Sequence, residues 1–92
     1  MEFSLAMRVA VPPDVLVNEI GGESVLLNLD GGRYFGLDEI GTRMWKALTN
    51  TDSIQAAYET LLREYDVDAE SLKRDLQDLV ERLAKHGLLQ VI

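Results

Sequence analysis

The stretch LDGGRYFGLDEIG, residues 29–41, changes its pattern halfway and thereby decides the fold. Its first part joins a glycine-marked turn to a short apolar and aromatic run, which is typical of a β-strand that follows a hairpin turn. From Asp38 the apolar spacing becomes helical, and aspartate is a residue type that caps helix N-termini. We therefore expect a strand over residues 33–37 that leads directly into a helix.

Two further strands are expected before this stretch, at residues 14–20 and 23–29. Both runs are rich in β-branched and apolar residues, and Gly21 and Gly22 between them suit the positive φ of a tight hairpin turn. An N-terminal segment, residues 1–13, alternates apolar and other residues with a period of two and ends at two prolines. It could pair with its own sheet or with that of a neighbouring molecule. The alternating residues are Phe3, Leu5, Met7, Val9 and Val11.

Three helices are expected after the strands. The first runs from Asp38 to near Asn50, the second is capped by Asp52 or Ser53, and the third follows Asp68 over residues 69–86. The third helix carries a core-facing stripe and ends at Gly87; the stripe is Leu72, Leu76, Leu79 and Leu83. Strands followed by helices indicate an α+β fold with the helices on one face of the sheet, and the apolar tail either packs back or forms a short strand.

Composition limits the class of protein. A chain of 92 residues that is 47% hydrophobic predicts one domain over residues 1–92. The absence of cysteine excludes disulfides and thiolate sites, and favours a cytoplasmic setting. A net charge of −7, with no excess of bases on the third helix, argues against nucleic acid as partner. We find neither a signal peptide nor an apolar run of membrane-spanning length, so no membrane is expected.

A search for catalytic chemistry finds little. His86 is the single histidine and lies where a helix C-terminus is expected, so it fits a capping role. Asp75 and Asp78 sit among basic residues and fit a solvated helix face, and the glycine pairs match no phosphate-binding pattern. The sequence therefore predicts a binding protein rather than an enzyme, with no metal and no cofactor.

Three stretches taken together resemble the PqqD-like family, the small leader-peptide recognition elements of ribosomal peptide natural-product pathways. They are VLLNLDGGRYFGLDEIGTRMWKAL at residues 25–48, LLREYDV at 61–67 and DLQDLVERLAKHGLL at 75–89. The resemblance runs from about residue 15 to the C-terminus. As a free-standing module, the chain is most similar to the separate leader-binding protein of split lasso-peptide systems. In those systems a transglutaminase-like cysteine protease and an ATP-dependent cyclase are other polypeptides.

The resemblance implies a winged-helix-like fold in which a leader peptide adds as a strand beside the third strand, in a groove against the third helix. The strand residues of that site would be Arg33, Tyr34, Phe35, Gly36 and Leu37. Strand alternation turns Phe35 and Leu37 toward the helices, where simple core packing would explain them equally well. On the third helix, Lys73, Val80 and Leu76 are expected to flank the groove, and Leu76, Leu79, Val80 and Leu83 to line apolar pockets for the leader.

Three alternatives remain open from the sequence. The chain resembles nearly as well the PqqD protein proper, which presents its peptide to a radical SAM enzyme in pyrroloquinoline quinone biosynthesis. A winged-helix DNA-binding regulator has the same architecture, but the acidic charge opposes it. A structural subunit that docks to an enzyme without touching peptide is the third.

Overall fold

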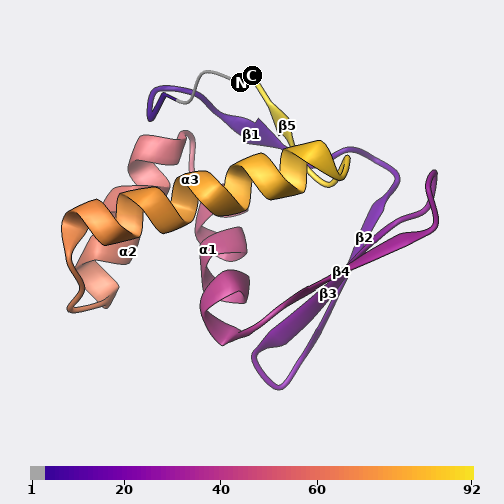
Figure 1. The fold of residues 1–92 in the computed structure, drawn as a ribbon, viewed down its shortest axis with the longest axis horizontal. Helices are drawn as coiled ribbons and strands as arrows, with labels where there is room; N and C mark the ends of the chain where they lie inside the picture. Colours follow the sequence, from indigo (N-terminus) through magenta and orange to yellow (C-terminus); the bar gives the residue numbers. More distant parts are fainter. Residues whose placement is uncertain (1–3) are drawn as a thin grey trace.

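The computed structural model describes residues 4–92, and Figure 1 shows a small β-sheet joined to a group of three helices. The elements are β1 (Val9–Ala10), β2 (Val15–Ile20), β3 (Glu23–Asn28), β4 (Arg33–Leu37), α1 (Glu39–Asn50), α2 (Ile54–Glu64), α3 (Ala69–Lys85) and β5 (Gln90–Val91). The expected strands and helices are present in the expected order, and short strands lie at both ends of the described chain.

The strands β2, β3 and β4 form an antiparallel sheet with β3 at its centre. Gly21 and Gly22 have φ values of 60° and 85°, the positive values that a type I′ turn needs between β2 and β3. Gly32, with φ of 65°, closes the connection from β3 to β4, and its N–H donates to the Asn28 carbonyl oxygen at 2.7 Å. The glycine turns predicted from the sequence are therefore confirmed.

The ends of the helices are set by side chains that satisfy their first N–H groups. Asp38 accepts from Gly41 N–H at 2.7 Å, and Asp68 accepts from Ser71 N–H at 2.9 Å. Of the two candidates for the second helix, Ser53 is the cap. The third helix ends at Lys85, one residue earlier than expected, because His86 is its C-cap residue and Gly87 then turns the chain with φ of 72°.

The N-terminal segment pairs within its own chain. β1 pairs antiparallel with β5, so the tail forms the short strand that was one of its two expected outcomes. Residues 5 and 6 form a turn rather than the expected continuous extension, and Phe3 lies outside the described residues. The turn lets the carbonyls of Met7 and Leu5 accept the first N–H groups of α2, from Ile54 at 2.9 Å and Gln55 at 2.8 Å.

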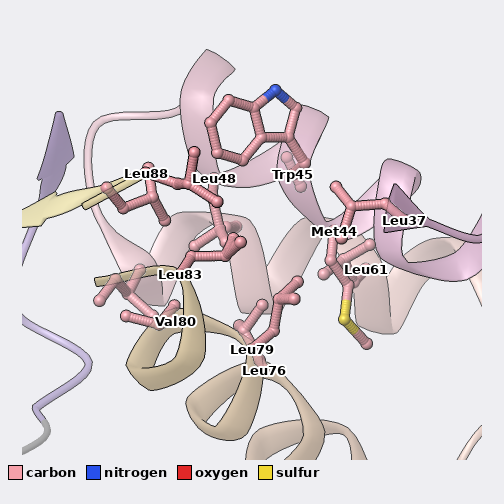
Figure 2. Close-up of a cluster of buried hydrophobic side chains, with 14 of the residues drawn as sticks. Leu37, Met44, Trp45, Leu48, Leu61, Leu76, Leu79, Val80, Leu83 and Leu88 are labelled. Carbon is pink, nitrogen blue, oxygen red and sulfur yellow. The ribbon is translucent and has the colours of Figure 1, made fainter. Parts of the chain in front are cut away.

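The core lies between the three helices and one face of the sheet. α1 packs against β3 and β4, where Leu26 and Leu37 are buried. The leucine stripe of α3 joins the same buried cluster as the apolar side chains of α1 and α2 (Figure 2). The predicted stripe is confirmed, because all four of its leucines are buried. Ser24 and Thr42 are the polar pair beneath the sheet, with their hydroxyl oxygens 2.7 Å apart. The helices cover one face of the sheet, and its other face is open.

Candidate functional site

The strand β4 is an edge strand whose outer side has no neighbour among residues 4–92. One hydrogen bond shows which main-chain groups of each strand face which neighbour. Leu29 N–H donates to the Asp14 carbonyl oxygen, so the main-chain groups of the odd-numbered residues of β3 face β2. The main-chain groups of the even-numbered residues of β3 therefore form the hydrogen bonds to β4, and their partners in the register are Arg33, Phe35 and Leu37. The main-chain N–H and C=O groups of Tyr34 and Gly36 consequently face the open edge.

The side chains of β4 alternate as expected. Phe35 is half-buried against the core and Leu37 is buried, so the prediction that both face the helices is confirmed. Tyr34 is 75% exposed on the opposite face, and Arg33 is exposed at the start of the strand. At Gly36 an added Cβ would meet no atom within 4 Å, so nothing in the described chain fills the space beside this residue.

The C-terminal half of α3 lies beside β4, on the side where the family resemblance places the groove. The Phe35 ring lies edge-on to the His86 ring at 5.4 Å, and the Arg82 guanidinium lies 5.9 Å from the Phe35 ring centre. Farther along, a shallow cavity of about 240 Å³ lies between the start of α1 and α3, bordered by Asp38, Gly41 and residues of α3. Its lining residues from α3 are Asp75, Asp78, Leu79 and Arg82.

The structure corrects the expected helix wall of the groove. Leu76, Val80 and Leu83 have no exposed surface, so their side chains belong to the core and do not line a pocket open to a peptide. Leu79 borders the cavity but is only 4% exposed. At 3.6 residues per turn, Lys73 and Val80 lie on the flank of the stripe opposite to Asp78 and Arg82. The expected helix phase was therefore wrong.

The residues that the sequence pattern did not assign to the groove are Asp75, Asp78, Arg82 and His86. Asp75 and Asp78 were expected on a solvated face and His86 at a helix cap, and the structure does make His86 the C-cap residue. His86 and Arg82 also contact Phe35, which local patterns do not reveal. A helical wheel of the sequence could have grouped them, since these four residues share one flank of the leucine stripe. A helical wheel does not reveal which of the two flanks of the stripe lies beside β4 in the folded chain.

The open face of the sheet carries an apolar surface, which we call the outer face. Cross-strand register places Leu16, Leu27 and Tyr34 in one row, and Asn18, Val25 and Gly36 in the next. Ile20 is 74% exposed beside these rows. A hollow of about 440 Å³ lies over Gly36. Exposed apolar patches of this kind on a small protein mark sites of interaction.

An ion pair outside the edge strand links two of the helices. The ion pair of Arg43 with Glu64 joins α1 to α2, and the hydrogen bond from Arg43 lowers the pKa of the Glu64 carboxyl. Within residues 4–92, no group of three histidine or acidic side chains could hold a metal ion. None of the helices seen in this part of the chain is both long and apolar enough to span a bilayer.

Comparison with known families shows to which family the chain belongs. The family model for PqqD, coenzyme PQQ synthesis protein D, matches residues 23–89, which include β3, β4 and all three helices. The chain belongs to the PqqD family. The resemblance seen in the sequence is thus confirmed, and no curated protein matches this PqqD family member.

Two solved structures resemble this PqqD family member. TbiB1 in complex with the TbiA(beta) leader peptide is 36% identical, with a TM-score of 0.81 over 87% of this chain and 93% of that chain. Lasso peptide synthetase B1 complexed with the leader peptide is 24% identical, with a TM-score of 0.80 over 90% of this chain and 98% of that chain. At 24% identity the second likeness shows the fold alone. The predicted α+β fold is confirmed.

Proposed function

We propose that this PqqD family member binds the leader segment of a ribosomally made precursor peptide, as a strand added to β4, and presents it to separate processing enzymes. The observation that carries the proposal is the open edge at Tyr34 and Gly36, next to which Arg82 of α3 lies over the Phe35 ring. The similarity to TbiB1, whose structure holds the TbiA(beta) leader peptide, supports a lasso-peptide leader as the ligand. In this proposal the chain carries the leader peptide and catalyses no reaction itself.

Strand addition suits this edge physically. Tyr34 and Gly36 each offer one donor and one acceptor, and each bond to a guest strand contributes about 0.5–1.5 kcal/mol net. The absence of a side chain at Gly36 leaves room for a bulky guest residue on the outer face. Phe35, Arg82 and His86 would contact the alternate guest side chains that point into the groove. Backbone bonds supply affinity in this scheme, and the groove supplies selectivity.

A titration tests the binding. Fluorescently labelled TbiA(beta) leader, and the leader of the precursor encoded beside this gene, would be titrated with the protein and followed by fluorescence anisotropy. We expect saturable binding with a Kd well below about 100 μM, which corresponds to about −5.5 kcal/mol. Failure of both leaders to bind at that concentration would contradict the proposal.

Presentation to an enzyme has a candidate surface in the outer face. A strand added to β4 would extend this face, because every second guest side chain would point to the same side as Tyr34. An enzyme that packs on the outer face would therefore contact carrier and guest together. The partners proposed for it are the transglutaminase-like leader protease and, after cleavage, the ATP-dependent cyclase.

A pair of variants separates presentation from binding. Ile20→Asp puts a charge on the outer face, and Ile92→Asp puts one on another highly exposed apolar residue, near β5. We expect Ile20→Asp to abolish co-purification with the protease while leaving the leader Kd within about twofold, and Ile92→Asp to change neither. Unchanged co-purification of Ile20→Asp would exclude the outer face.

The family description, coenzyme PQQ synthesis protein D, favours one alternative. In that alternative the chain binds the precursor peptide of the cofactor and presents it to a radical SAM enzyme. Competition between a lasso leader and that precursor for the same labelled complex would rank the two. Adjacent genes for a short precursor, a transglutaminase-like protease and an asparagine-synthetase-like cyclase would support the lasso assignment. A neighbouring radical SAM gene would support the alternative.

A further inference from the structure

The side chains that border the proposed groove between β4 and α3 carry opposite charges toward its two ends. α3 runs antiparallel to β4, because Asp75 and Asp78 border the cavity near Asp38 whereas His86 lies against Phe35. Arg82 lies between them, since it borders that cavity and also lies over the Phe35 ring. Its C-terminal end is held next to the β3–β4 hairpin by the Asn28 amide, which donates to the His86 and Gly87 carbonyls at 3.5 and 3.4 Å. The end near α1 is therefore acidic, and the hairpin end is basic.

The charged groups at both ends are exposed and available to a guest. Arg82 and Asp78 form an i, i+4 pair at 3.1 Å, with 55% and 64% of their side chains exposed. Arg33 is exposed where β4 begins, directly opposite Asn28 in the register. Asp75 is exposed one turn before Asp78. Pairs this exposed are held weakly, so a guest charge can replace either member at small cost.

We propose that the groove selects the charge order of its guest: it prefers a strand that carries a carboxylate opposite Arg82 and Arg33 and a cation opposite Asp75 and Asp78. The inference rests on the proposed strand addition. The sheet is antiparallel throughout, and antiparallel pairing is the more stable kind, so the guest runs antiparallel to β4. Its N-terminal end then lies near Asp38, and its cation precedes its carboxylate.

Helix and strand geometry set the spacing of the two guest charges. Asp75 and Arg82 are seven positions apart, which is about 10 Å along a helix and about three residues along a strand. Only alternate guest side chains point into the groove, so the charges lie two or four residues apart in the guest. A unit charge about 4 Å from another in water changes Kd by about fivefold, and salt weakens the effect.

Selection from a library of random twelve-residue peptides, displayed on their own mRNA, tests the proposal whatever the sequence of the natural leader. The baits are the wild type and the double variant Asp78→Arg/Arg82→Asp, which keeps the net charge and the i, i+4 pair but reverses their order. The matched control is Glu59→Arg/Arg63→Glu, an exposed pair at the same spacing on α2. Thermal melts verify that each bait is folded.

We expect the wild type and the control to enrich peptides with a cation two or four residues before a carboxylate. Asp78→Arg/Arg82→Asp should lose this preference, because its two new charges oppose those of Asp75 and Arg33. Resynthesised peptides and their charge-reversed forms should differ at least fivefold in Kd. If the swapped protein does not fold, Asp78→Asn/Arg82→Gln serves instead and should show a weaker charge order than the wild type, because Asp75 and Arg33 remain. The inference is overturned if the wild type enriches peptides without charge order or with the opposite order. It is also overturned if a folded α3 variant enriches peptides with the same charge order, as strongly as the wild type does. Enrichment of no peptide by any folded bait overturns the proposed function itself.

Discussion

Replacement of Gly36 by proline tests the open edge of β4 without disturbing the hydrogen bonds to β3. The Gly36 N–H faces outward, so proline removes no bond to β3, and the space beside the residue is free of atoms within 4 Å. Edge strands tolerate proline in this position. The folded protein should therefore survive the change, whereas a guest strand would meet a ring where it needs a donor.

The expected loss follows from the bonds at this residue. A guest pairs with both the N–H and the C=O of Gly36, and the proline ring disturbs both bonds. Two bonds at about 0.5–1.5 kcal/mol each amount to about 1–3 kcal/mol, or a rise in Kd of about 5- to 150-fold. Fluorescence anisotropy with the labelled leader measures the change, and a thermal melt reports folding.

Three companion variants make the result specific. Gly36→Ala keeps the N–H and should bind within a few-fold of wild type. Val17→Pro removes an outward N–H from the opposite edge, on β2, and should leave the Kd unchanged. Phe35→Pro removes an N–H that bonds to β3, and it should destabilise the fold instead. A folded Gly36→Pro protein that binds the leader like wild type would refute guest pairing at β4.

Three further predictions concern stability and pH. Leu76→Ala should lower the free energy of unfolding by about 2–5 kcal/mol in urea titrations, because Leu76 is fully buried; a loss of leader binding at unchanged stability would instead place it in the groove. Thr42→Val leaves the buried Ser24 hydroxyl without its partner and should lower the free energy of unfolding by about 1–3 kcal/mol. The double variant Ser24→Ala/Thr42→Val should lose less than the sum of the two single changes. Strict additivity would contradict the coupling of the two hydroxyls. At pH values above about 4.5, Glu64→Gln should lower Tm by a small amount, because the hydrogen bond from Arg43 lowers the folded-state pKa of the Glu64 carboxyl and so stabilises the ionised form. This difference in Tm should vanish as acid protonates the wild-type carboxyl. A difference that grows in acid would contradict this sign.

The sequence by itself determined the elements and most of their ends. Glycine pairs marked the hairpin turns, Asp38 and Asp68 marked helix starts, and Gly87 marked the last helix end, all as the structure has them. These signals are local, because a turn or a cap depends on residues only a few positions apart. Strand alternation was equally local, and it correctly turned Phe35 inward and Tyr34 outward.

Tertiary structure alone decided which flank of α3 meets β4. A leucine stripe has two flanks, and only the way the helix packs selects the one with Asp78 and Arg82 over the one with Lys73. The register of β3 against its two neighbours decided that Tyr34 and Gly36 face the open edge, and contacts distant in sequence decided that β1 pairs with β5. Such features arise from residues that meet only in the folded chain, so no local pattern encodes them.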